Sequence, residues 1–471
     1  MSNTFQRTTD SDIRTQVLIV GGGPAGLSAA HQLRNTGISV TLVDENAELG
    51  GQYFRQRSEI VRETAGDFRK RGRTLVESVK DSAILILSSS FVFAVNDSEK
   101  IFYVYNEVTG GVVSIWCEFV IFATGSQELV LPYLGWETPK CITPGMASRI
   151  FDIDHISPDQ SIVIGGSGPF LLSVAAHLVE RGVKVLAVLE YHDPYRFRLS
   201  SALVVFFPTR LFEYLNYRLQ LRRAKVPIHT NVQISDVAFN NDRLESKFKS
   251  RSSARELTYV SDYVAVSYGF IPTTEFASLV EIQLDESSHI RSTSTRFNGQ
   301  TSKDWVYIVG ESVNIQGWRA ALLRGQIAAI SILKSLKAVS LLQRLQYIRL
   351  FVAAKYEHLF TSIRARTFNE GEPFEFSTSD NLLVCRCENV SYREIALYLD
   401  HPWSTASGLK AESRVGMGTC QGKQCGYALG RICASLVGQS GETFTNPRTP
   451  LRPVPIKAIV KLPDQSKLAE H

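Results

Sequence analysis

Residues 16–45 read QVLIVGGGPAGLSAAHQLRNTGISVTLVDE, and this stretch decides the fold. An apolar run leads into Gly21-x-Gly23-x-x-Gly26, an Ala- and Leu-rich segment follows, and a second apolar run ends at Asp44. In a strand–turn–helix–strand unit, the first glycine permits a tight turn, the second lets backbone approach a pyrophosphate, and the third lets helix and strand pack closely. The N–H groups that begin the helix hold phosphates, and an acid about 20 residues on binds a ribose hydroxyl. The stretch therefore predicts a dinucleotide site in an α/β unit, and the agreement of all its parts speaks against a plain glycine-rich loop.

A second copy of this plan lies at residues 161–190, SIVIGGSGPFLLSVAAHLVERGVKVLAVLE, and ends at Glu190. Gly166 and Gly168 occupy the first two glycine positions, but Leu171 stands where the third is expected. A leucine there pushes the helix off the strand or fills the approach of the nucleotide. We predict a structural relic that binds no NAD(P), and nucleotide binding remains the alternative.

Three further stretches indicate which nucleotide the first unit binds. LGGQYFR (49–55), VIFATGS (120–126) and WVYIVGESVNIQGWRAALLRGQIAAI (305–330) resemble the segments that complete the FAD site of two-dinucleotide-binding-domain flavoproteins. This resemblance implies a Rossmann-like α/β fold with the second unit inserted into the first, and YVAVSYGFIPTTEF (263–276) resembles the strand that returns the chain to the FAD domain. That family usually has Asp where this chain has Glu311, so the ribityl-binding carboxylate is retained one methylene further out. The FAD-binding residues implied are Gly21, Gly23, Gly26, Asp44, Gly51, Gln52, Thr124, Gly125, Gly310 and Glu311.

Four of the seven cysteines fall in the last fifth of the chain, as Cys385 and Cys387 in VCRCEN and Cys420 and Cys425 in GMGTCQGKQCG. Thiolates at a helix N-terminus are stabilised by its dipole, and loop glycines free backbone N–H groups to bond sulfur. Structural zinc sites usually have gaps of two to four residues in both pairs, which the single-residue gap at Cys385 does not match. A purely structural cysteine cluster is the third interpretation. The spacing C-x-C-x32-C-x4-C resembles the [2Fe–2S] domain of bacterioferritin-associated ferredoxin, which implies that these four cysteines bind the cluster.

The other cysteines have no such pattern. Cys117 and Cys141 stand alone, without the CxxC of a disulfide reductase, and we expect both in the core, together with Cys433. Ser391 and Glu394 form a capping box that predicts a short helix between the two cysteine pairs.

Composition excludes several functions. The 471 residues carry a net charge of +5 without a long Lys/Arg run, so nucleic-acid binding is not indicated. The N-terminus is polar, and no run approaches the ~18 apolar residues of a transmembrane helix. We expect a cytoplasmic protein, peripheral at the inner membrane only through its electron acceptor. The domains expected are 14–140 and 266–335 (FAD-binding), 141–265 (degenerate NAD(P)-type), 336–380 (helical linker), 381–440 ([2Fe–2S]) and 441–471 (extended tail).

This order of units, along nearly the whole chain, resembles the flavin-and-cluster subunits of bacterial amine-oxidising dehydrogenases. SRVGMGTCQGKQCG and LRPVPIKAI (451–459) are typical of that group, which includes subunits of opine oxidase, hydrogen cyanide synthase, and proline and hydroxyproline dehydrogenases. The resemblance implies an electron-transfer subunit with FAD and a [2Fe–2S] cluster, working as a heterodimer with a second flavoprotein that oxidises an amine. Electrons then pass to a respiratory acceptor.

The first expectation for the substrate is an opine such as octopine or nopaline, cleaved to L-arginine and a 2-oxo acid. Cyanide-forming glycine oxidation and proline or hydroxyproline oxidation are alternatives within the group. An NAD(P)H-dependent reductase and a non-catalytic scaffold are alternatives outside it. No His/Asp or Lys constellation suits an amine-oxidising base, so the catalytic residues stay unassigned.

The end of the chain, residues 445–463, contains five prolines, which favour an extended course. Its apolar residues Val454, Ile456, Ile459 and Val460 predict docking, either on the chain's own flavin domain or on the partner, with a disordered end as the alternative.

Overall fold

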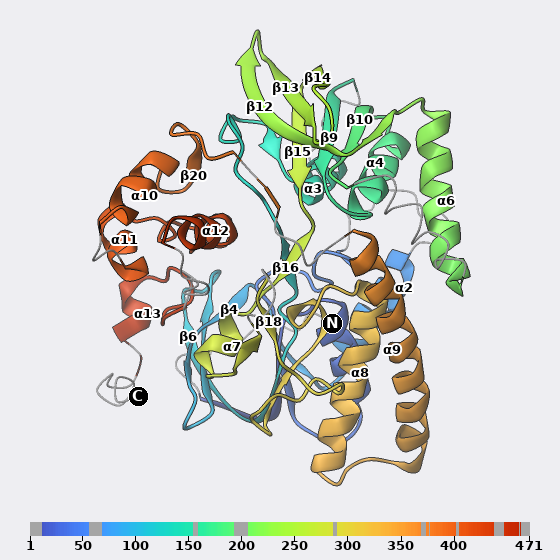
Figure 1. Ribbon diagram of the computed structural model, residues 1–471. Helices are drawn as coiled ribbons and strands as arrows, with labels where there is room; N and C mark the ends of the chain where they lie inside the picture. The colour runs from blue at the N-terminus through green and yellow to red at the C-terminus, as the bar shows by residue number, and fades with distance from the viewer. Residues whose placement is uncertain are drawn as a thin grey trace.

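Two α/β units, each built on a parallel sheet, form most of the molecule (Figure 1). The computed structural model describes residues 12–55, 68–153, 159–192, 206–285, 290–368, 374–375, 377–401, 405–437, 447–460 and 462. The apolar run before each glycine turn becomes a central strand, buried on both faces, as expected where helices cover both sides of a parallel sheet.

The first sheet has the order β3-β2-β1-β6-β5-β4, with β19 also paired to β6. Its parallel part is β1 (Ile13–Val20), β2 (Val40–Val43), β3 (Leu85–Leu87), β6 (Val112–Phe122) and β19 (Val306–Ile308), and β4 (Ser90–Asn96) and β5 (Ile101–Asn106) run antiparallel. Helices α1 (Pro24–Leu33) and α8 (Trp318–Ser335) pack tightly, since a Cβ on Gly325 would lie 2.1 Å from the Ala25 carbonyl oxygen. This unit thus combines segments from both sides of the insertion.

The second sheet has the order β11-β10-β9-β15-β8, and all its pairs are parallel. Its strands are β8 (Cys141–Ile142), β9 (Ser161–Gly166), β10 (Lys184–Glu190), β11 (Ile228–Thr230) and β15 (Tyr263–Ser267). Helices α3 (Pro144–Ile153), α4 (Phe170–Glu180) and α6 (Pro208–Arg223) belong to this unit, as does the antiparallel sheet β12 (Val232–Asn240), β13 (Arg243–Ser250) and β14 (Glu256–Ser261). Cys117 and Cys141 are buried in the cores of the first and second units, as predicted.

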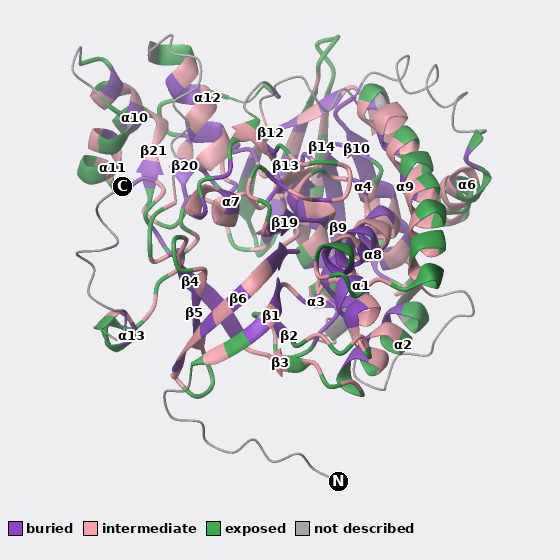
Figure 2. Cartoon of the chain, turned by 90° about the horizontal axis from the view of Figure 1, so that it is seen from below, coloured by how far each residue is buried: buried purple, intermediate pink, exposed green. Residues whose placement is uncertain are grey.

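The chain crosses between the units twice, in β7 (Ser126–Glu128) and β16 (Phe270–Pro272), which pair antiparallel. After the second crossing come α7 (Glu275–Leu279), β17 (Leu284–Asp285), β18 (Ser292–Thr293) and the short 3-10 helix η2 (Gly310–Ser312). Two further helices border the first unit, α2 (Phe68–Lys80) and α9 (Leu341–Thr367). The linker 336–380, predicted to be helical, contains α9, which begins at Leu341, ends at Thr367 and shows exposed residues along its length (Figure 2).

The C-terminal cysteines lie in a small separate core. It contains β20 (Leu383–Cys385), β21 (Val390–Ser391), α10 (Tyr392–Leu399), α11 (Ala406–Ser413) and α12 (Gly426–Val437). The capping box is confirmed, because the Glu394 N–H donates to the Ser391 hydroxyl and the Ser391 N–H to the Glu394 carboxylate. Cys433 is buried in this core, also as predicted.

The end of the chain docks on the flavin unit, which is one of the two surfaces predicted for it. The Leu451 N–H donates to the Phe93 carbonyl on β4 at 2.8 Å, and Ala458 and Leu462 are buried against β4 and β5. The expected extended course is wrong for α13 (Ile456–Val460), where the Pro455 carbonyl accepts the Ala458 N–H at 2.8 Å. Docking is also partial, because Ile456 and Val460 are 79% and 76% exposed.

Among the residues that the structure describes, no helix has the length and apolar character needed to cross a bilayer.

Candidate functional site

The glycine turn after β1 has the shape that a pyrophosphate requires. Gly21 has φ +107°, and a Cβ there would lie 2.4 Å from the Ala123 carbonyl oxygen. A Cβ on Gly26 would lie 1.8 Å from the Gly21 carbonyl oxygen, so this position must lack a side chain for α1 to reach the strand. At Gly23 the nearest atom to such a Cβ is the Gly51 Cα at 3.9 Å, which leaves room above the helix N-terminus. The turn therefore fits a phosphate at Gly23 and helix packing at Gly26.

Asp44 lies against this turn and is hydrogen-bonded to it. Its buried carboxylate accepts the Gly22 N–H at 2.5 Å through Oδ2 and the Asn46 N–H at 2.7 Å through Oδ1. Burial raises the pKa of Asp44, against these hydrogen bonds, which lower it. The structure places Gly51 next to Gly23, whereas the side chain of Gln52 is exposed.

The other predicted flavin residues meet the glycine turn at the same edge of the sheet. A Cβ on Gly310 would lie 2.8 Å from the Ala25 Cβ, which shows how closely η2 approaches α1. The Ser312 hydroxyl accepts the Gly125 N–H at 2.7 Å and lies 3.2 Å from the Thr124 hydroxyl. Ser312 thus joins the loop after β6 to the turn after β19.

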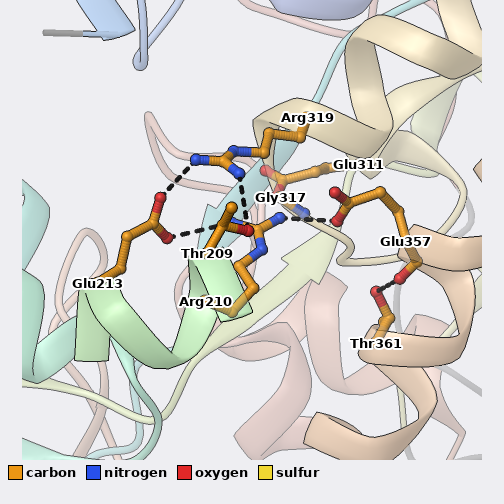
Figure 3. Close-up of polar contacts among 8 residues, drawn as sticks. All are labelled: Thr209, Arg210, Glu213, Glu311, Gly317, Arg319, Glu357 and Thr361. Carbon is orange, nitrogen blue, oxygen red and sulfur yellow. Dashed lines mark hydrogen bonds and ion pairs between the residues drawn. The ribbon is translucent and has the colours of Figure 1, made fainter. Parts of the chain in front are cut away.

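Glu311 projects toward the N-terminus of α8 (Figure 3). Its carboxylate accepts the Ser126 hydroxyl at 2.9 Å and the Gly317 N–H at 3.1 Å. Burial raises the pKa of Glu311, and both hydrogen bonds lower it. The longer side chain therefore ties η2 to α8 and to the crossing strand β7.

At the corresponding edge of the second unit, the acidic residue is bonded by its own neighbours. The Glu190 carboxylate accepts the Gly168 N–H at 3.1 Å and lies 2.8 Å from Nδ1 of His192. The same nitrogen lies 2.9 Å from the Ser167 hydroxyl, and the ring of His192 packs edge-on against Phe368 and Phe374. Leu171 lies in the first turn of α4 and is buried. As at Asp44, a backbone N–H of the turn bonds the carboxylate, but here a buried imidazole also lies against it. This additional contact supports the prediction that this unit binds no NAD(P).

The four C-terminal cysteines come together as two contacting pairs. The Cys425 thiol hydrogen-bonds the Cys385 sulfur, and the Cys420 thiol hydrogen-bonds the Cys387 sulfur. The first pair is buried, whereas Cys387 is exposed and Cys420 is intermediate. The pKa of Cys385 is lowered to about 6, chiefly by the hydrogen bond from Cys425. Backbone N–H groups, of which that of Gly416 has the largest effect, lower the pKa further, whereas burial raises it.

The four thiols match the ligand set of a [2Fe–2S] cluster in number and kind. Within the described parts of the chain, no group of three or more His, Cys, Asp or Glu side chains is arranged to hold one metal ion. A [2Fe–2S] cluster requires four thiolates, two for each iron, and N–H donors to sulfur tune it. The pairs Cys385/Cys425 and Cys387/Cys420 have this composition, and the backbone N–H groups around Cys385 supply the donors.

Both cysteine segments are hydrogen-bonded to the connection between the α/β units. Gln127 on β7 donates through Nε2 to the carbonyl of Lys423, which lies between Cys420 and Cys425, at 2.9 Å. Trp136 donates through Nε1 to the carbonyl of Leu383, two residues before Cys385, at 2.6 Å. The cysteine domain is therefore attached beside the loop that follows Gly125.

A family model described as pyridine nucleotide-disulphide oxidoreductase matches residues 15–325, which include both glycine turns and both crossing strands. The chain belongs to this family. Pyridine nucleotide-disulphide oxidoreductases have the Rossmann-like FAD-binding α/β fold predicted from the sequence, so that part of the fold prediction is confirmed.

Two relatives match this chain over nearly its whole length. An opine oxidase subunit of Agrobacterium tumefaciens (strain Ach5) is 26% identical, over 98% of this chain and 94% of its own length. Hydrogen cyanide synthase subunit HcnB of Pseudomonas protegens is also 26% identical, over 96% of this chain and 99% of its own. The resemblance to this group is confirmed by these relatives. The crystal structure of L-proline dehydrogenase from P. horikoshii has the same fold, with a TM-score of 0.65, 17% identity, and coverage of 97% of this chain and 81% of that one.

Several residues at this site were not found from the sequence. Ser126, Ser312, Gln127, Trp136 and His192 act through contacts with segments distant in the sequence. Ser126 lies within the quoted VIFATGS and Ser312 directly after Glu311, so proximity to a motif was the available signal for those two. Gln127 and Trp136 have no motif of their own, because their partners are backbone carbonyls 296 and 247 residues away.

Proposed function

We propose that this chain is the FAD- and [2Fe–2S]-bearing electron-transfer subunit of an amine oxidase complex, with an opine such as octopine or nopaline as substrate. The observation that carries the proposal is the position of the paired cysteines. Both cysteine segments are hydrogen-bonded by residues of the strand and loop that leave the predicted flavin site. A short path between two redox centres is what an electron-transfer subunit needs.

The chemistry divides between two proteins. Loss of a hydride and a proton converts the secondary amine of an opine to an imine, and addition of water releases L-arginine and a 2-oxo acid. The second flavoprotein subunit performs that oxidation, and a respiratory acceptor finally takes the two electrons. FAD and the cluster, when bound, supply the electron-carrying chemistry in this chain.

This chain's residues position the redox centres and exclude competing donors. Gly23 and Asp44 bind the nucleotide end of the flavin, and Glu311 and Ser312 hold the loops near its other end. Cys385, Cys387, Cys420 and Cys425 hold the cluster. Glu190, His192 and Phe374 close the second nucleotide edge, so pyridine nucleotides do not deliver electrons.

The test is dye reduction by the co-expressed pair, this chain with the amine-oxidising subunit, measured with octopine, nopaline, glycine and proline. Opine-dependent dye reduction that needs both subunits is expected. The curated relatives also include hydrogen cyanide synthase, so glycine-dependent reduction with cyanide release would move the assignment to that activity. Bleaching of the flavin of the isolated chain by NADH or NADPH alone would overturn the proposal in favour of a reductase.

A further inference from the structure

Helix α9 (Leu341–Thr367) carries apolar side chains on two opposite faces. On its inner face, the ring of Phe351 lies 4.5 Å from that of Phe297, and Ala354 is buried. On its outer face lies a line of large apolar side chains that, in the described structure, are exposed to 47–73%, namely Leu341, Leu345, Ile348, Val352, Tyr356 and Leu359. We call these six residues the outer stripe (Figure 2 shows exposed residues on this helix). Apolar patches of this size are normally covered, and in the part of the chain that the structure describes most of this one is not. Tyr356, whose hydroxyl donates to the Phe206 carbonyl at 2.9 Å, is the least exposed of the six.

The spacing of the outer stripe identifies the shape of what covers it. Its members follow one another at steps of four, three, four, four and three residues, and Leu342, which is also exposed, lies beside this line in the first turn. At 3.6 residues per turn the six residues occupy roughly 80° of the helix surface and about 27 Å of its length. Leu342 widens the stripe to roughly 120° in the first turn alone. Beyond that turn, a stripe this narrow resembles the seam of a coiled coil, whereas a helix lying on lipid or on a broad core has an apolar face of 100° or more along its length.

The charges beside the stripe identify the chemistry of the partner. Arg344 lies on one flank and Arg349 on the other, and both are exposed, whereas the Lys355 ammonium lies 4.3 Å from the ring centroid of Phe297. The acidic residue of α9, Glu357, is instead paired with Arg210 at 2.8 Å. Two copies of this helix would therefore place cations against cations, which opposes self-association. A helix with Asp or Glu beside its apolar stripe is the complementary surface.

The helix is held rigidly in position for such an encounter. Arg210 of α6 bridges to Glu357 of α9 and to Glu213 of its own helix, and Glu213 pairs with Arg319 of α8 at 2.5 Å (Figure 3). Arg210 also stacks on the ring of Phe360 with its carbon Cζ 5.1 Å from the ring centroid. Three helices are thus joined behind the outer stripe, so little ordering is needed on binding.

We infer that the outer stripe of α9 binds a helix of the second subunit, apolar along one narrow stripe and acidic at its flanks. The inference rests on the proposed function for the identity of that partner. The partner's helix would lie along α9 and bury the six exposed side chains against its own.

The test uses the full-length tagged chain and the second flavoprotein that co-purifies with it in stoichiometric amount, identified by mass spectrometry. The double variant Ile348→Glu/Val352→Glu should weaken that assembly about 30-fold or more, since buried hot-spot side chains are lost. Its flavin content should equal that of the wild type, because both positions are exposed. The matched control is Val108→Glu, at a residue 79% exposed on the turn between β5 and β6, which should assemble normally.

A photo-crosslinking residue at position 348 should join the chain to an amphipathic, acidic helix of the second subunit. Crosslinking to another copy of this chain would overturn the inference that the outer stripe binds the second subunit. So would loss of sedimentation with phosphatidylglycerol-containing vesicles in the double variant, and so would unchanged assembly of that variant. Unchanged assembly would leave the proposed function intact. Failure of any second flavoprotein to co-purify with the wild type would overturn the proposed function itself.

Discussion

Gln127 donates a hydrogen bond of 2.9 Å to the backbone carbonyl of Lys423, across 296 residues of sequence. Gln127 follows Ser126, whose hydroxyl bonds to Glu311, and Lys423 lies between two predicted cluster ligands. This single contact therefore joins the predicted flavin loops to the cysteine loop.

Replacing Gln127 with Leu should slow electron transfer from flavin to cluster without loss of either cofactor. The variant leaves the Lys423 carbonyl without its donor, at a cost of about 1 kcal/mol, and releases the cysteine loop from β7. Stopped-flow absorbance of the reduced flavin measures the rate. Gln300→Leu is the control, because the Gln300 side chain bonds Asp304 and Arg296 at the surface. Equal rates in both variants would show that Gln127 does not position the loop.

The two glycines Gly23 and Gly26 should respond differently to alanine. Gly23 has φ −76°, and its added Cβ would meet nothing closer than 3.9 Å, so Gly23→Ala should fold but lose flavin affinity through contact with the phosphates. Gly26→Ala places a Cβ 1.8 Å from the Gly21 oxygen and should unfold at a lower temperature. Flavin content after gel filtration and thermal unfolding separate the two effects. A fully flavin-loaded Gly23→Ala protein would place the phosphates elsewhere.

Cysteine variants should separate cluster ligands from core thiols. Cys425→Ser should reduce iron and labile sulfide from about two of each per chain to near zero, because the cluster needs all four thiolates. Cys433→Ser should retain both, since Cys433 is a packed residue of the C-terminal core. Iron and sulfide analysis of anaerobically purified protein gives the result, and stoichiometric zinc without iron would contradict the cluster.

Restoring the third glycine of the second unit should not restore nucleotide binding. Leu171→Gly opens the helix approach, yet Glu190 remains engaged by Gly168 and His192. Titration of this variant with NADH and NADPH, followed by flavin absorbance, should show no bleaching. Bleaching in the variant alone would make Leu171 the single obstacle.

The docked end of the chain should stabilise the flavin unit through its buried residues alone. Leu462→Ala should lower the free energy of unfolding by about 2 kcal/mol, because Leu462 is 8% exposed against β4 and β5. Ile456→Ala should change it by less than about 0.5 kcal/mol at a position 79% exposed. Urea unfolding followed by flavin fluorescence compares them, and equal effects would contradict the docking.

The sequence by itself determined the two glycine turns, the strands and helices beside them, the Asp44 position and the cysteine spacing. Each of these depends on residues within about 40 positions of one another, and for the turns, strands and helices, periodicity and turn sterics act locally. Capping at Ser391 followed from an equally local pattern, and burial of Cys117, Cys141 and Cys433 from the general preference of unpaired cysteines for the core.

The tertiary structure alone decided which distant segments meet. Examples are the pairing of Cys385 with Cys425, the hydrogen bonds that Gln127 and Trp136 donate, and the packing of His192 against Phe368 and Phe374. These contacts are made through backbone carbonyls, thiols and ring edges, which many side chains can contact. The same holds for the end of the chain, where composition predicted docking but the buried and exposed sides of α13 depend on the shape of β4 and β5. The outer stripe of α9 is visible as a periodicity in the sequence, yet its exposure depends on α8 covering the other face.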